Sequence, residues 1–190
     1  YTKVSGPSWL GVSANGALSG TPLPANTGAN AFVVRATDPT GLFDEAALNI
    51  QVLNEPVWTN QAGGSWPVSG NWLAGLVAAG SGNIADFSTL DLTADTVVTL
   101  DGARTIGGLS FSDNTPSHNW TINTGTAGPL TLNAASGAPS INVTNQTATL
   151  NSPVAGTQGL TKSGAGILTL GAANSFTGGL VISGGTVRLQ

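Results

Sequence analysis

The sequence predicts an all-β protein whose C-terminal two thirds form a stacked β-solenoid. Short runs in which apolar residues alternate with polar ones recur along the chain, as in strands that bury one face. Turn-forming glycines and asparagines separate these runs at intervals of roughly 8 to 12 residues, which suits a sandwich or a parallel β-helix. No window of the 190 residues carries a sustained helical period.

The composition narrows the class of protein further. Charged residues make up 7% of the chain, against about 25% in a typical soluble domain. Stacked strands would place like charges of successive turns side by side, so a low charge suits a solenoid. Five basic residues and a net charge of −4 exclude nucleic-acid binding through phosphate neutralisation. The absence of cysteine excludes disulfides and thiolate metal sites, and no apolar stretch approaches the roughly 20 residues of a membrane span.

Residues 1–54 form a first predicted module of short strands. Residues 31–37 are rich in β-branched and aromatic types, and residues 46–53 alternate Ala, Leu, Ile and Val with polar neighbours. Between them lies the turn tetrapeptide Asp38-Pro39-Thr40-Gly41, with a proline suited to φ of about −65° and a glycine suited to positive φ. We therefore expect two strands joined by a turn, and a module boundary near Asn54.

From Glu55 onward the composition changes, and we expect two further regions. Residues 55–95 are a tryptophan-rich cap region of the solenoid, and residues 96–190 form its rungs. Glycine and asparagine at the corners, with threonine on the outward faces, favour a solenoid over a sandwich. The predicted rung strands are the alternating runs at residues 96–100, 105–112, 119–123, 130–133, 141–145, 147–150, 167–170, 180–183 and 186–189.

Four motifs of the first module resemble a known repeat family. They are Gly6-Pro7-Ser8-Trp9-Leu10, the run at residues 15–22 beginning Asn15-Gly16, Ala36-Thr37-Asp38, and the run at residues 48–52. Their order and spacing resemble the bacterial putative-Ig, or dystroglycan-type cadherin-like, repeat. The resemblance implies an Ig-like β-sandwich spacer of a secreted surface protein. Because the family's first strands precede these motifs, the module is expected to be partial.

The C-terminal segment resembles a second family. Residues 159–170 read Gly-Leu-Thr-Lys-Ser-Gly-Ala-Gly-Ile-Leu-Thr-Leu, and residues 173–179 read Ala-Asn-Ser-Phe-Thr-Gly-Gly. This is similar to the autotransporter-associated β-strand repeat, with its Leu-Thr-Lys-x-Gly-x-Gly-x-Leu-x-Leu pattern. The resemblance covers most of residues 57–190. It implies a right-handed parallel β-helix with a structural or adhesive role, without catalytic residues or cofactors.

Three tryptophans of the cap region, Trp58, Trp66 and Trp72, are candidate glycan-binding residues. Flat aromatic faces with a polar edge can stack on sugar rings. The alternative, which we favour, is that the three indoles close the open end of the solenoid and bury its first rung.

Three carboxylates of the first module, Asp38, Asp44 and Glu45, are candidate ligands for Ca²⁺. Cadherin-like repeats hold Ca²⁺ between modules, and a hard cation needs six to eight oxygen ligands. The alternative is that Asp38 initiates a turn while Asp44 and Glu45 are solvated. This stretch lacks the dense aspartate pattern of a complete site, which favours the alternative.

Catalysis finds little support in the sequence. Asp91 and Asp101 could in principle act as the carboxylate pair of a glycosidase. The one histidine, His118, lies in a turn-like loop, and no Ser-His-Asp spacing accompanies it. We therefore expect a protein that is not an enzyme.

Taken together, these observations predict a structural or adhesive segment of a large secreted or cell-surface bacterial protein. Its expected partners are neighbouring modules or copies of itself, with polysaccharide as an alternative ligand. The length of 190 residues is short for proteins that carry these repeats. We expect either an excerpt of a longer chain or a fibre subunit whose ends are completed by β-strand addition.

Overall fold

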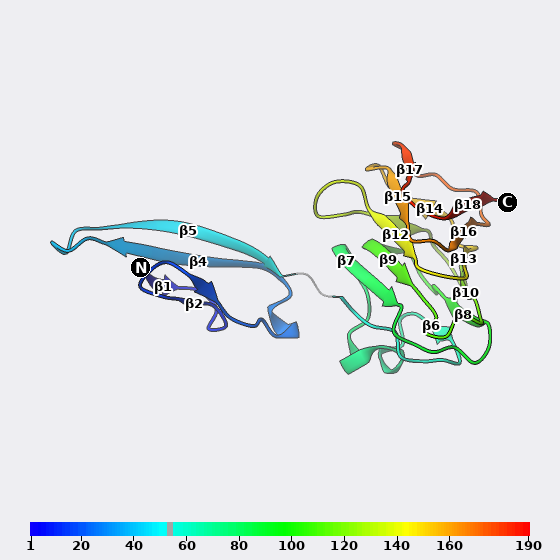
Figure 1. The fold of residues 1–190 in the computed structure, drawn as a ribbon, viewed down its shortest axis with the longest axis horizontal. Coiled ribbons are helices and arrows are strands. Elements are labelled where there is room, and N and C mark those ends of the chain that lie inside the picture. The colour runs from blue at the N-terminus through cyan, green and yellow to red at the C-terminus, as the bar shows by residue number, and fades with distance from the viewer. Residues whose placement is uncertain (53–54) are drawn as a thin grey trace. The chain divides into compact units, whose positions relative to one another are not determined.

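The computed structural model describes residues 1–52 and 55–190. In these residues the regular elements are β-strands and short 3₁₀ turns, so the all-β prediction is confirmed. The chain divides into two compact units, Tyr1–Asn54 and Glu55–Gln190 (Figure 1). The predicted boundary near Asn54 falls on residues 53 and 54, which lie outside the described residues. Among the described residues, no helix has the length and apolar character needed to cross a membrane.

Unit 1 contains a three-stranded antiparallel sheet with the order β1–β4–β5. The elements of this unit are β1 (Thr2–Ser5), β2 (Gly11–Val12), β3 (Leu18–Ser19), the 3₁₀ turn η1 (Pro24–Asn26), β4 (Gly28–Thr37) and β5 (Phe43–Val52). Strands β4 and β5 pair along their whole length, and β2 pairs separately with β3. The predicted strands 31–37 and 46–53 belong to the β4–β5 hairpin, with residue 53 outside the described part.

The core of unit 1 is small. Leu10 and Phe32 are its buried apolar side chains among the described residues. The Trp9 ring meets Phe32 edge-on at 5.3 Å, and its Nε1 donates a hydrogen bond to Oδ1 of the buried Asn30 at 3.2 Å. One sheet and one short hairpin surround this core, so a two-sheet Ig-like sandwich stays an expectation for this unit.

Unit 2 is a parallel β-solenoid of about four turns. One of its sheets stacks six parallel strands in the order β18–β16–β13–β10–β8–β6. These strands are β6 (Gly64–Ser65), β8 (Thr96–Thr99), β10 (Trp120–Asn123), β13 (Thr147–Leu150), β16 (Ile167–Leu170) and β18 (Thr186–Leu189).

The second sheet of unit 2 is branched at its longest central strand, β9 (Arg104–Phe111). The start of β9 pairs with β11 (Leu130–Leu132), which in turn pairs with β14 (Val154–Ala155). The end of β9 pairs with β7 and with β12, which continues to β15 and β17. The bounds of these strands are β7 (Gly80–Phe87), β12 (Ser140–Val143), β15 (Leu160–Ser163) and β17 (Leu180–Ile182). The turns β10–β11–β12 and β13–β14–β15 therefore each add one strand at each of three positions, whereas the next turn in the described part of the chain has β16 and β17 alone.

Between β6 and β7, two 3₁₀ turns replace regular strands. They are η2 (Ser69–Asn71) and η3 (Leu73–Gly75), and they are separated by Trp72 in an extended conformation. This irregular segment lies at the start of unit 2, where the predicted cap region was placed.

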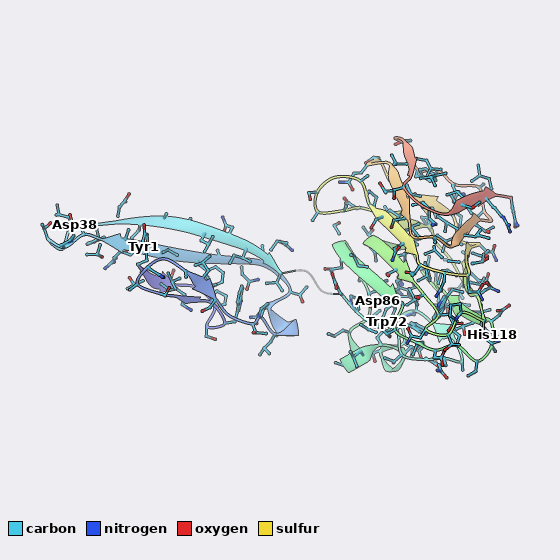
Figure 2. The ribbon with its side chains drawn as sticks, viewed as in Figure 1. Tyr1, Asp38, Trp72, Asp86 and His118 are labelled. Carbon is cyan, nitrogen blue, oxygen red and sulfur yellow. The ribbon has the colours of Figure 1, made fainter. Side chains whose placement is uncertain are left out.

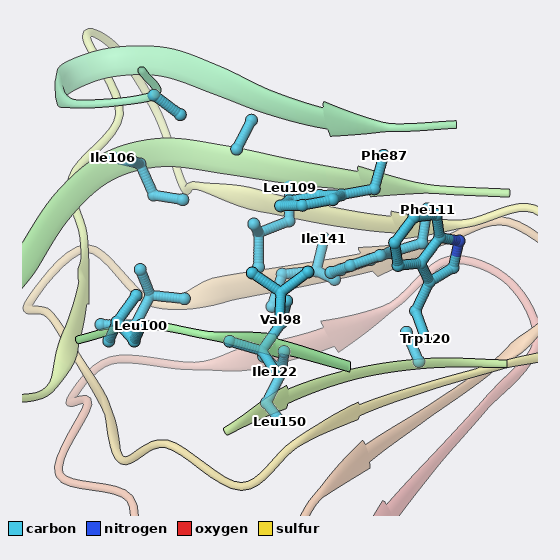
Figure 3. Packing of buried hydrophobic residues seen from close by; sticks show 14 of the residues in the cluster. Phe87, Val98, Leu100, Ile106, Leu109, Phe111, Trp120, Ile122, Ile141 and Leu150 are labelled. Carbon is cyan, nitrogen blue, oxygen red and sulfur yellow. The ribbon is translucent and has the colours of Figure 1, made fainter. Parts of the chain in front are cut away.

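Inward-facing side chains of successive turns form columns in the core. Register places Trp120 beside Ala148, Ala148 beside Leu168, and Leu168 beside Val187. Trp120, Ala148 and Leu168 belong to one buried apolar cluster, and the partly buried Val187 packs against it; Figure 3 shows part of this cluster in close-up. The intervening residues face outward, so alternation along each strand separates core from surface.

Most predicted rung strands are observed within a residue or two of their expected bounds. Strands β6, β7, β14 and β15 were not predicted. The Gly-Ser-Gly-Asn start of β7 shows no apolar alternation, and β14 is only two residues long. In β15 an inward position is occupied by Lys162 instead of an apolar residue, which breaks the pattern.

Candidate functional site

The structure brings the three predicted tryptophans together at the start of the solenoid. Trp58 and Trp72 form an isolated antiparallel bridge, and Trp66 follows directly after β6. The Trp58 and Trp72 rings meet edge-on at 5.0 Å, and the Trp66 and Trp72 rings lie 5.2 Å apart. Figure 2 labels Trp72 within this part of unit 2.

All three indoles are buried, and their polar edges are satisfied inside the protein. Trp58 and Trp66 are 0% exposed and Trp72 is 3% exposed. Each Nε1 donates to a backbone carbonyl: Trp58 to Asn60 at 2.7 Å, Trp66 to Ala78 at 2.9 Å, and Trp72 to Trp66 at 2.7 Å. Buried donors without partners would be costly, so these bonds stabilise the indoles in the interior.

Phe87, at the end of β7, connects the cap to the rungs. Its ring lies 5.4 to 5.6 Å from each of the three indoles. On its other side it stacks on Phe111 at 5.1 Å with an interplanar angle of 13°. This central role could not be predicted from the local pattern, in which Phe87 is an apolar residue that ends a short run. The packing favours the capping interpretation, and a glycan could reach these rings only if the cap opened.

The carboxylates of unit 1 are held by their own turn and strand. Asp38 Oδ1 accepts hydrogen bonds from the N–H and hydroxyl of Thr40 and from the N–H of Leu42. The Thr40 hydroxyl and these amides lower the pKa of Asp38, although burial opposes the shift. Asp38 is thus the turn-initiating residue of the β4–β5 hairpin.

The other two carboxylates of the calcium hypothesis have different neighbours. Glu45 forms an ion pair with Arg35 on the adjacent strand, and the Arg35 guanidinium lies 4.0 Å from the centre of the Phe43 ring. Asp44 accepts a hydrogen bond from the N–H of Glu45. Within the described ranges, no three His, Cys, Asp or Glu side chains form a group suited to a metal ion. Calcium binding at Asp38, Asp44 and Glu45 therefore stays a prediction.

Asp101 and Asp91, the carboxylates of the enzyme hypothesis, connect neighbouring turns. Asp101 accepts hydrogen bonds of 2.6 Å from the hydroxyls of Ser65 and Thr99, and one of 3.1 Å from the N–H of Thr126. The two hydroxyls are the main cause of its lowered pKa. A glycosidase acid needs a raised pKa, so Asp101 is not suited to that role. Asp91 accepts a hydrogen bond from the N–H of Thr115.

A buried carboxylate, Asp113, holds the loop that contains His118. It accepts bonds from the N–H groups of Leu92, Ser117 and His118. Burial acts to raise the pKa of Asp113, but these backbone donors outweigh it and the pKa is lowered. His118, labelled in Figure 2, is half-buried, and its Nδ1 lies 3.1 Å from the carbonyl oxygen of Leu92. The predicted solvated loop histidine is therefore a loop residue with internal partners.

Parallel strands stacked around one apolar core define unit 2 as a β-solenoid of the repeat class. Two family models match the chain. Residues 160–189 match the passenger-associated-transport-repeat, and residues 1–53 match the putative Ig domain. Both resemblances expected from the sequence are thereby confirmed.

A relative of known class also links the chain to autotransporter proteins. The chain is 37% identical over 131 residues to a protein described as "Adhesin BmaC autotransporter" from Brucella suis biovar 1 (strain 1330). The match covers 69% of this chain and 4% of that protein, so the chain corresponds to a small part of its relative. No solved structure matches the chain.

Proposed function

We propose that this chain is a structural, adhesive passenger segment of a large bacterial surface protein. The observation that carries the proposal is the continuous core of unit 2, in which a single apolar cluster runs from Trp58 to Leu170. Because every turn packs on the turns before and after it, such a segment is a stiff spacer that can present neighbouring modules.

The surface of the solenoid suits this role. No acidic residue follows Asp113 in the sequence, and the only charged residues after it are Lys162 and Arg188. Thr121 and Thr149 lie in register on the half-buried outward side of two successive strands, and their register neighbour on the next strand, Thr169, is buried. Stacked threonines can form favourable cross-strand contacts, whereas stacked like charges would repel.

The matches to known proteins support the proposed cellular location of the chain and its proposed adhesive role. The relative's printed description, an autotransporter adhesin, supports a secreted or cell-surface location and a role in attachment. The hydrogen bonds of Asp91 and Asp101 are accounted for by loop and turn structure, which supports a role other than catalysis. The expected partners are neighbouring modules or further copies of the chain.

Limited proteolysis tests the spacer role. With a protease of broad specificity under native conditions, we expect residues 55–190 to survive as one fragment. The same digestion in denaturant shows that cleavage sites are present. Rapid native cleavage within the strands of unit 2 would contradict a stiff spacer.

Adhesion is tested with beads coated with the full chain and applied to cultured cells and to immobilised polysaccharides. Binding by the folded chain, absent from beads coated with heat-denatured chain, supports an adhesive segment.

A glycan array with wild type and Trp66→Ala tests whether the tryptophans of the cap region bind a glycan. Loss of glycan binding in a folded Trp66→Ala variant would favour the tryptophan site, and hydrolysis of a glycan would contradict a non-enzymatic segment.

A further inference from the structure

Lys162 occupies an inward position in the core of unit 2. Its register neighbours on the preceding and following turns are Ile141 and Ile182. The lysine is 0% exposed. An amine therefore follows the buried Leu109 and Ile141 in this apolar column, and a buried charged amine is unfavourable unless its donors are satisfied.

The Lys162 ammonium is surrounded by backbone carbonyl oxygens. Its Nζ lies 2.7 Å from the oxygen of Ser163, 2.8 Å from that of Gly164 and 3.1 Å from that of Gly184. An ammonium has three N–H donors, so these three acceptors satisfy it completely. Burial lowers the pKa of Lys162, and the three acceptors oppose that shift because they stabilise the charged form.

No carboxylate takes part in this arrangement. The sequence contains no acidic residue after Asp113, and the ion pair found in the described part of the chain is Arg35–Glu45 in unit 1. The charge of Lys162 is therefore balanced by peptide dipoles alone.

The three acceptors belong to corners of two different turns. Ser163 is the last residue of β15 and Gly164 begins the corner after it, whereas Gly184 lies in the corner after β17, one turn later. Gly164 has a φ of +76°, and in the later corner Gly185 has a φ of +68°. A Cβ at Gly185 would lie 2.6 Å from the carbonyl oxygen of Gly164. Only glycine allows this conformation and this close approach, so the glycines bring the corners together and the lysine connects them.

We propose that Lys162 is a latch that makes one turn of the solenoid depend on the docking of the next. Two acceptors come from its own turn and the third from the following turn. The ammonium is fully satisfied only when the corner at Gly184 is in place. The latch thus supplies a specific nearest-neighbour coupling, in addition to the general packing of adjacent turns. The Lys-x-Gly-x-Gly run of the repeat acts as one device, in which the lysine provides donors and the glycines shape the corner.

Hydrogen–deuterium exchange on the full chain tests the latch with Lys162→Met, which preserves the side-chain length and removes the donors. We expect the amides of residues 183–186 to exchange at least about ten-fold faster than in wild type. These include the Ser183 N–H, which donates to the carbonyl of Lys162. Amides of β10 should keep their rates. Lys3→Met, which changes the only other lysine of the chain, is the charge-matched control and should leave both regions unchanged.

Two outcomes would overturn the latch. Unchanged or slower exchange at residues 183–186 would show that Lys162 is only a tolerated buried charge. Equal acceleration in β10 and at residues 183–186 would show a general loss of stability without specific coupling. If Lys162→Met does not fold, the wild-type protein decides by NMR. The latch predicts a slowly exchanging Nζ–H signal from Lys162 at neutral pH, and a rapidly exchanging amine would refute it.

Discussion

Units 1 and 2 are both built from β-strands, but the strands of unit 2 bury many more of their side chains than those of unit 1. In unit 1 the ten-residue strand β5 has no buried side chain, and Leu18, Leu42 and Phe43 are exposed. In unit 2 most strands alternate buried and half-buried positions around one continuous cluster. Both units contain strands that pair along most of their length. The difference therefore shows that burial, more than strand formation, should set their relative stabilities.

The largest expected effect comes from Trp66→Ala in unit 2. Removing a fully buried indole from the cap should lower the free energy of unfolding of unit 2 by about 3–5 kcal/mol. Urea unfolding followed by peptide-resolved hydrogen exchange measures each unit separately. The control is Trp9→Ala, which should affect unit 1 and leave unit 2 unchanged. A cost below about 1 kcal/mol for Trp66→Ala would contradict the capping interpretation and favour a ligand-binding role.

A pair of glycines offers a second comparison. Gly63 in unit 2 and Gly41 in unit 1 have φ values of +77° and +91°, so alanine is strained at either position. A Cβ at Gly63 would lie 2.1 Å from the carbonyl oxygen of Val97, whereas a Cβ at Gly41 would meet nothing within 4 Å. We expect Gly63→Ala to lower the free energy of unfolding of unit 2 by roughly 3 kcal/mol, and Gly41→Ala to lower that of unit 1 by about 1 kcal/mol. Equal costs, measured from urea midpoints, would show that backbone strain alone determines the effect.

Acid should weaken unit 2 partly through Asp113. The folded-state pKa of this group is lowered, so its stabilising contribution is present above the unfolded-state pKa and is lost as the pH falls through the folded-state value. Asp113→Asn should reduce the stability of unit 2 at neutral pH and flatten its decline below about pH 5. Asp38→Asn, in unit 1, should leave the acid transition of unit 2 unchanged. A steeper decline in Asp113→Asn would contradict the assigned sign.

The smallest loss of stability is expected for a substitution on the exposed face of unit 1. Phe43 is 59% exposed, and its described ring contact is with the Arg35 guanidinium. Phe43→Ala should lower the free energy of unfolding of unit 1 by at most about 1 kcal/mol. Phe32→Ala, which removes the buried ring of the same unit, should cost roughly 3 kcal/mol or more. Thermal unfolding of the two variants would refute the small-core description of unit 1 if their costs were equal.

The sequence pattern predicted the rung strands well because alternation is a local property. In β10 and β13 each inward residue is apolar and each outward residue is polar, and both strands were found. Strand β15 was missed because Lys162 faces inward, and one of the three acceptors of its ammonium, Gly184, lies in a corner about twenty residues later. Local patterns carry no information about such partners.

The candidate site shows the same limit. The three tryptophans were singled out from the sequence because they are conspicuous and close together. Their burial depends on Phe87 and on hydrogen bonds to the carbonyls of Asn60, Ala78 and Trp66, which only the path of the chain reveals. For the acidic residues, residue type alone could not distinguish a metal ligand from a turn former.

The stacking of turns also determines how much chain length the solenoid stores. Nineteen residues separate Leu168 from its register neighbour Val187, and they advance the stack by one inter-strand spacing of about 4.8 Å. Fully extended, the same residues would span about 60 Å. A turn pulled away from its neighbour would therefore release roughly ten times the length it occupied. Under tension, unit 2 would lengthen in discrete steps and dissipate work while the remaining turns kept their core.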